Sequence, residues 1–125
     1  MKQKTDNDAL IYRKMQRVML EKRLFLRKGL SRDDLAREVL TNRTYITRAL
    51  SRKGMNFARF VNAFRAQYAI EMMLSDKYRN MPQADIAEMC GFSHVQTMNR
   101  YIKKCAGSTA CAMRSRVLAD DFFAP

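Results

Sequence analysis

The sequence has little glycine, proline or cysteine, and it contains no tryptophan. Its four glycines and two prolines in 125 residues leave long stretches without a helix breaker. The three cysteines are an odd number and none form a CxxC pair, which argues against a secreted disulfide framework. We therefore expect a protein of the reducing cytosol, in which the cysteines pack as small apolar residues.

Long apolar runs and catalytic motifs are also missing. No run approaches the ~18 residues of a membrane span, and the N-terminus lacks the apolar segment of a signal peptide. The sequence has no Ser/His/Asp arrangement, Gly-rich phosphate loop or HExxH motif. The one histidine, His94, has no set of cysteine and histidine residues around it at the spacings of a metal site. We predict no enzymatic activity, no cofactor and no bound metal.

Positive charge is what the chain has in excess. It carries 24 Lys and Arg against 12 Asp and Glu, which gives a net charge of +12 and a pI near 10.1. A balance of this size favours a polyanionic partner, either nucleic acid or a membrane surface. The hydrophobic fraction of 47% is high enough for a folded core, so disorder is not expected.

The spacing of apolar residues predicts an all-α fold of about seven helices. We expect residues 1–8 to be frayed and the first helix to end at Lys28-Gly29. Five methionines fall on the core faces of the expected helices: Met15, Met19, Met72, Met89 and Met98. The expected helices are 8–25, 31–39, 43–53, 56–75 (the longest), 82–89, 93–104 and a short one capped by Thr109. Phe122-Phe123 would lie in a terminal tail.

Two stretches, 31–52 and 82–104, have the same organisation. Each combines a short helix, a tight turn and a second helix with one apolar and one basic polar face. The apolar faces are Ile46, Ala49 and Leu50 in the first stretch and Met98, Tyr101 and Ile102 in the second. One such unit is an ambiguous signal. Two in tandem on a strongly basic chain indicate two helix-turn-helix units that bind DNA.

The repeat suggests four segments. Residues 1–54 form the N-terminal helix and first helix-turn-helix, 55–75 a linker helix, 76–118 the second helix-turn-helix, and 119–125 a tail. A helix over 56–75 would span ~28 Å. Successive major-groove faces on one side of DNA lie ~34 Å apart, so such a linker suits two adjacent grooves.

Four motifs resemble a known family. They are NRTYITRAL (42–50), GMNFARFVN (54–62), ADIAEMCGFS (84–93) and RYIKK (100–104). Over about residues 24–116 the chain resembles the DNA-binding domain of AraC/XylS-type transcriptional regulators. The resemblance implies seven helices with two helix-turn-helix units on a long linking helix. It also implies promoter binding, often with direct contact to RNA polymerase.

The resemblance and the residue types together give candidate DNA contacts. Arginine suits guanine, asparagine and glutamine suit adenine, and threonine methyls or valine suit the thymine methyl group. The expected base contacts are Arg43, Thr44, Thr47 and Arg48 in the first unit and Val95, Gln96, Asn99 and Arg100 in the second. The expected phosphate contacts are Asn42, Arg52, Lys53, His94, Lys103 and Lys104.

The chain departs from the family pattern in two ways. Near the C-terminus the family has a Thr-Pro pair followed by an aromatic residue, where this chain has Thr109-Ala110 and Met113. Leu50, Met98 and Ile102 also stand at commonly aromatic positions. Because these three exchange one apolar residue for another, we expect the fold to be preserved.

The sequence thus predicts a sequence-specific double-stranded DNA-binding regulator of transcription. It favours a monomer and leaves dimerisation open. Three alternatives stay open. The fold could serve as a protein-interaction module, such as an anti-activator, or bind nucleic acid without sequence preference, or bind a membrane surface through basic amphipathic helices.

Overall fold

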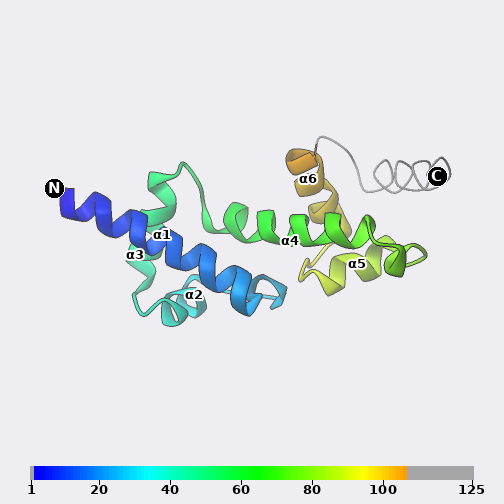
Figure 1. The fold of residues 1–125 in the computed structure, drawn as a ribbon, viewed down its shortest axis with the longest axis horizontal. Coiled ribbons are helices and arrows are strands. Elements are labelled where there is room, and N and C mark those ends of the chain that lie inside the picture. Colours follow the sequence, from blue (N-terminus) through cyan, green and yellow to red (C-terminus); the bar gives the residue numbers. More distant parts are fainter. Residues whose placement is uncertain (1, 107–125) are drawn as a thin grey trace. The chain divides into compact units, whose positions relative to one another are not determined.

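Helices make up the fold in the computed structural model, which describes residues 2–106 (Figure 1). Six α-helices, two short 3₁₀ helices and no strand occur in this range, so the predicted all-α class is confirmed. The helices are α1 (Lys2–Lys22), η1 (Leu24–Leu26), α2 (Arg32–Glu38), α3 (Arg43–Arg52), α4 (Phe57–Met73), η2 (Asp76–Tyr78), α5 (Gln83–Met89) and α6 (Val95–Ala106). The short helix expected at Thr109, the Thr109-Ala110 departure and Phe122-Phe123 lie outside the described residues.

The chain divides into two units, with the boundary between Val61 and Asn62 inside α4. Unit 1 contains α1, α2, α3 and the first residues of α4. Unit 2 contains the rest of α4 together with α5 and α6. Each unit has its own buried apolar residues, so each can be described by itself.

In unit 1, α3 packs against both α1 and α2. Met15 and Met19 of α1 are fully buried, as are Leu35 of α2 and Ile46 of α3. The ring of Tyr12 meets Phe60 edge to face, with 5.6 Å between centroids. Because apolar side chains from all three helices share this core, the orientation of α3 depends on α1 as well as on its own turn.

Local hydrogen bonds define both the start of α2 and the turn between α2 and α3. The Ser31 hydroxyl accepts from the Asp34 amide over 3.1 Å, and Asp34 accepts in return from the Ser31 amide over 3.0 Å. This capping box fixes the start of α2. At its end the Thr41 amide donates to the Ala36 carbonyl over 2.9 Å, and Leu40 has a φ of 60°. Helix α3 then begins at the Asn42 cap.

Unit 2 repeats this turn. The Phe92 amide donates to the Ala87 carbonyl over 2.9 Å, and Gly91, with a φ of 90°, stands in the place of Leu40. Both turns therefore end their first helix with a residue of left-handed conformation, followed by a residue whose amide donates to the carbonyl five positions before it. Behind the second turn, the fully buried Cys90 thiol lies 3.6 Å from the Met72 sulfur.

Several predicted boundaries are wrong. Helix α1 begins at Lys2, although residues 1–8 were expected to fray, because Asp8 anchors its first turns to α3. It ends at Lys22 and not at Lys28-Gly29, since Arg23 adopts a left-handed φ of 51°. With 21 residues α1 is longer than α4, which has 17 and spans about 25 Å.

Met89 is the one predicted core methionine that the structure places outside the core, with 43% of its surface exposed. The buried face of this segment consists of Ile86, Ala87 and Cys90. Each residue of a helix turns by about 100°, so Met89 lies to the side of that face. The predicted burial of Met15, Met19, Met72 and Met98 is confirmed.

Candidate nucleic-acid interface

The first candidate surface is the outer side of α3, called here the α3 face and made of Arg43, Thr44, Thr47 and Arg48. These four side chains and Ser51 line a shallow cavity of about 500 Å³. Helical periodicity explains the arrangement, because the opposite side of α3 carries the buried Ile46, Ala49 and Leu50. All four residues expected to contact bases in this unit therefore line one concave surface.

Arg48 is held by contacts from two directions. Its Nε donates to Oδ1 of Asp8 over 3.1 Å, and its guanidinium carbon lies 4.6 Å from the centre of the Tyr45 ring. The other carboxylate oxygen of Asp8 accepts from Nε of Arg52 over 3.0 Å. The Asp8 side chain is only 2% exposed, whereas Arg48 and Arg52 are 34% and 49% exposed. One buried carboxylate from α1 thus pairs with two arginines of α3.

The flanks of the α3 face are also engaged. Nε of Arg43 lies 3.5 Å from Oδ1 of Asp33, in an exposed ion pair of the kind that contributes little to stability. The side-chain oxygen of Asn42, an expected phosphate contact, accepts from the Tyr45 amide over 3.2 Å. Its structural role is therefore that of a helix cap. The Lys53 ammonium lies 5.2 Å from the centre of the Tyr12 ring.

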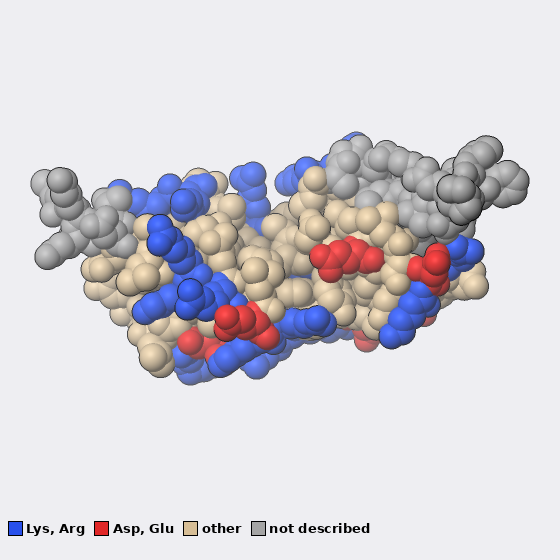
Figure 2. Space-filling view, in the orientation of Figure 1, with Lys and Arg blue, Asp and Glu red and all other residues tan. Residues whose placement is uncertain are grey.

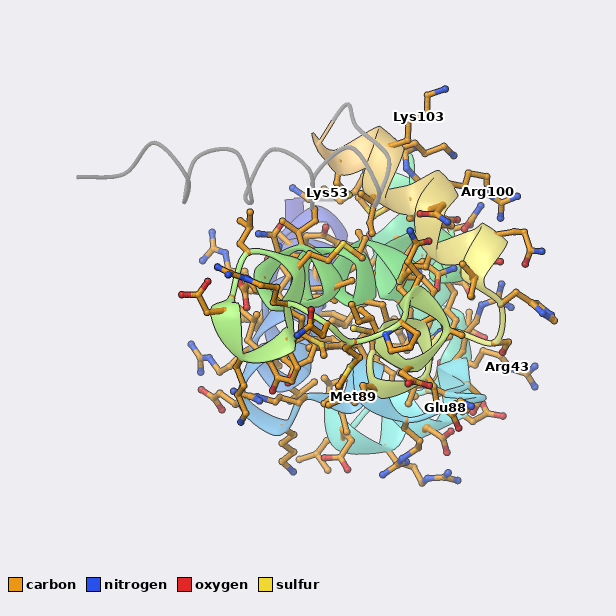
Figure 3. All side chains as sticks on the ribbon, turned by 90° about the vertical axis from the view of Figure 1, so that its right-hand side faces the viewer. Arg43, Lys53, Glu88, Met89, Arg100 and Lys103 are labelled. Atoms are coloured by element: carbon orange, nitrogen blue, oxygen red, sulfur yellow. The ribbon has the colours of Figure 1, made fainter. Side chains whose placement is uncertain are left out.

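The second candidate surface is the outer side of α6, called here the α6 face and made of Val95, Gln96, Asn99 and Arg100. Gln96 and Arg100 are exposed, and Figure 3 shows Arg100 extending outward from α6. Val95 is half-buried and packs against the core of unit 2. Asn99 is half-buried, and its Nδ2 donates to Oε1 of Gln83 over 3.3 Å. On the α6 face, therefore, Gln96 and Arg100 are exposed, whereas Val95 and Asn99 contact other residues of unit 2.

Cationic side chains surround the α6 face. Lys103 and Lys104 are exposed, and the Lys104 ammonium lies 5.1 Å from the centre of the Tyr101 ring. The guanidinium carbon of Arg100 lies 5.5 Å from the same ring centre. His94 is exposed at the start of α6, where its carbonyl accepts from the Met98 amide. Lysine and arginine side chains are visible on each unit in Figure 2, with acidic groups beside them.

Asp8 and Tyr45 are the contacts that sequence reasoning missed. Asp8 precedes Met15 by seven residues and Met19 by eleven, so it falls on the same face of α1 as these core residues. That spacing was a usable signal for a buried carboxylate. Nothing local, however, pointed to its partners, which lie 40 and 44 positions further along the chain.

Other types of site find little support in the part of the chain that the structure describes. No group of three or more His, Cys, Asp or Glu residues in residues 2–106 is placed to hold a metal ion. Burial raises the pKa of the Cys90 thiol to about 12, so Cys90 is unreactive at neutral pH. Within the same range, no helix combines the length and the apolar character needed to cross a membrane.

The geometry thus defines a tandem helix-turn-helix protein. Residues 35–116 match the family described as "Helix-turn-helix domain", which is of the AraC type. This match covers more than half of the chain, and the chain therefore belongs to the AraC-type helix-turn-helix family, as its sequence motifs predicted.

A solved structure of a DNA-binding transcriptional dual regulator from Escherichia coli K-12 is similar in fold. Its TM-score is 0.64, and the two proteins share 14% sequence identity over 93% of this chain and 92% of that one. At this identity the likeness shows a common fold. No curated protein sequence matches the chain.

Proposed function

We propose that the protein is a sequence-specific double-stranded DNA-binding regulator of transcription, with the α3 face and the α6 face each entering a major groove. One observation carries the proposal. In both units the helix after the turn buries its apolar side and presents guanidinium, amide or hydroxyl groups on the other. These groups are the ones that recognise base edges in the major groove. In helix-turn-helix proteins the second helix of the unit lies in the major groove.

The polar side chains on and beside the two faces have two roles in this proposal. Arg43, Thr44, Thr47, Arg48, Gln96, Asn99 and Arg100 contact base edges, with Val95 against a thymine methyl group. Arg52, Lys53, His94, Lys103 and Lys104 contact phosphates, and Asn42 does so in addition to capping α3. Phosphate contacts fix the position of a protein on the duplex, whereas base contacts give it sequence preference.

Selection of bound duplexes from a random-sequence library tests this function. The expected result is an enriched site with two conserved segments, one for each face, to which binding weakens steeply as salt increases. Equal recovery of all sequences would instead indicate a nonspecific nucleic-acid binder. Sedimentation of the free protein and of the complex gives the stoichiometry, for which we propose one chain per site.

A second candidate function, a protein-interaction module on the same fold, has one observation in its favour. Leu40 is 93% exposed and borders a groove of about 250 Å³ that also contains Leu10, Ile11 and Tyr45. Large exposed apolar residues in one place are typical of protein contacts. If the protein fails to bind duplex DNA even at low salt, this candidate replaces the first.

A further inference from the structure

Asp8 is the one buried charged residue among those whose side chains the structure describes, residues 7–105. A buried carboxylate is costly unless it is paired and hydrogen-bonded. Here the pairing uses both oxygens, one for Arg48 and one for Arg52. The two arginines are four residues apart on α3, so they would repel each other without the carboxylate between them.

The way in which the arginines bind leaves part of each guanidinium available. Both donate to Asp8 through Nε. Among the described residues, the side-chain hydrogen bonds of Arg48 and Arg52 are these two, and neither uses a terminal nitrogen. The Tyr45 ring covers one side of the Arg48 guanidinium. Arg48 is therefore fixed in direction while its terminal N–H groups stay free on the α3 face.

We propose that Asp8 is a positioning residue for base recognition, which holds Arg48 with its terminal N–H groups directed at a base edge. This inference rests on the proposed function. A free arginine loses rotamer freedom when it binds, and an arginine already fixed by a carboxylate and a ring loses less. Helix α1 would then contribute to DNA recognition by orienting a side chain of α3.

Replacing Asp8 has two effects of opposite sign. The variant Asp8→Asn removes a negative charge beside a surface that binds a polyanion, which raises the affinity for any duplex. It also releases Arg48, which lowers discrimination at the base pair that Arg48 contacts. A carboxylate with a purely structural role gives no selective loss at one base pair, so the two accounts predict different results.

The experiment measures discrimination as the ratio of two dissociation constants, for the selected site and for the same site with the Arg48-dependent base pair changed. That base pair is the one at which Arg48→Ala loses preference. We expect Asp8→Asn to reduce the ratio about 3- to 10-fold, the size expected from ordering one side chain. Affinity for a random duplex should be unchanged or higher. The matched control is Asp85→Asn, which removes the charge of an exposed aspartate in α5 and should leave the ratio unchanged.

A double-variant cycle links the effect to Arg48. In an Arg48→Ala background, Asp8→Asn should change the ratio no further. An unchanged ratio in Asp8→Asn alone, or an equal drop with and without Arg48, would overturn the inference. If the wild-type protein itself shows no base preference, the proposed function fails and this inference fails with it. If the wild-type protein shows base preference and Asp8→Asn leaves the ratio unchanged, only the positioning role is refuted and the proposed function stands.

A measurement on the wild-type protein covers the case in which Asp8→Asn fails to fold. Nitrogen-15 relaxation of arginine Nε–H groups in the free protein should show the Arg48 and Arg52 groups as rigid as the backbone. Arg48→Lys, which removes one resonance, supplies the assignment. The exposed Arg17 serves as the mobile reference. If the Arg48 Nε–H is as mobile as that of Arg17 before DNA binds, Asp8 does not position it.

Discussion

The side-chain amide of Asn99 donates to the amide oxygen of Gln83 over 3.3 Å, and this contact joins α6 to α5. A bidentate contact with adenine needs one N–H and the oxygen of an asparagine side chain. The bond to Gln83 uses one of the two N–H groups of Asn99 and fixes the orientation of its side chain relative to α5. Gln83 thus orients Asn99 in the same way that we propose for Asp8 and Arg48.

Replacing Gln83 should therefore weaken DNA binding although Gln83 lies outside both candidate faces. We expect Gln83→Ala to cost about 1 kcal/mol of binding free energy, the net value of one hydrogen bond. The loss should be confined to the DNA segment read by α6. Fluorescence titration against duplexes altered in one segment at a time measures it. Gln67→Ala, at an exposed position of α4, is the control and should have no effect. A Gln83 variant with wild-type affinity would mean that Asn99 does not depend on this bond.

The two arginines at the centres of the faces should each control one segment of the DNA site. We expect Arg48→Ala and Arg100→Ala each to cost ~1–3 kcal/mol and to relax preference in a different segment. Selection repeated with each variant measures the lost preference directly. Arg17→Ala removes an exposed arginine of α1 and should leave the selected sequence unchanged. Loss of preference in the same segment from both variants would contradict separate reading by the two units.

Lys103 should contribute to affinity without contributing to sequence preference. It is exposed next to the α6 face, and Figure 3 shows its side chain extending away from the helix. We expect Lys103→Ala to weaken binding to all duplexes alike and to lower the slope of log affinity against log salt by about one unit. Titrations at several salt concentrations give the slope. Lys77→Ala, which removes an exposed lysine of η2, is the control and should leave both the affinity and the salt slope unchanged. A Lys103 variant with altered preference would show that this side chain reads a base.

Local signals made much of this fold predictable. Ser31 and Asn42 are strong caps, and the structure shows both capping at the predicted positions. The spacing of Ile46, Ala49 and Leu50 correctly gave the buried side of α3, and hence its outer side. Such signals act within about four residues, so one sequence is enough to detect them.

Contacts between distant residues were beyond such reasoning. Arg48 was correctly assigned to the outer side of α3, but its pairing with Asp8 spans 40 positions and depends on how α1 packs. Asn99 likewise was expected to contact a base from the outer side of its helix, and its bond to Gln83, 16 positions away, was not predicted. Periodicity indicates the side of a helix on which a residue lies. It carries no information about which other element lies there.

Leu40 offers a test of strain in the first turn. Its φ of 60° is in the left-handed region, which costs a residue with a Cβ roughly 1–2 kcal/mol. Glycine avoids this cost, and the second unit has Gly91 at the equivalent place. We expect Leu40→Gly to raise the free energy of unfolding by at most about 1 kcal/mol, because the greater conformational entropy of glycine in the unfolded chain offsets part of the relieved strain.

Leu40→Ala separates strain from the removal of an exposed apolar group. The side chain is 93% exposed, so shortening it loses little packing, while the alanine Cβ keeps the left-handed strain. Urea unfolding of both variants should show a gain for glycine and almost none for alanine. Equal gains would show that strain at this turn is not the cause.

Alkaline pH should destabilise unit 2 through the Cys90 thiol. Burial raises its pKa from 9.0 to about 12, so above pH 9 the unfolded chain loses a proton that the folded chain keeps. The unfolded state then binds fewer protons, and the free energy of unfolding falls as pH rises. The fall begins near pH 9 and is complete only above the folded pKa. Between pH 8 and pH 10 the expected loss is about 1 kcal/mol.

Other groups also titrate in this range, so the measured quantity is a difference between two proteins. Burial raises the pKa of Tyr12 too, and for that reason the series stops at pH 10. Both proteins carry Cys105→Ser and Cys111→Ser, and one also carries Cys90→Ala. The alanine variant is less stable at every pH because it loses packing against Met72. Its stability should nevertheless fall less steeply with pH than that of the protein with Cys90. Parallel curves would mean that the thiol ionises as readily in the folded chain as in the unfolded one, and that the core around Cys90 opens to water.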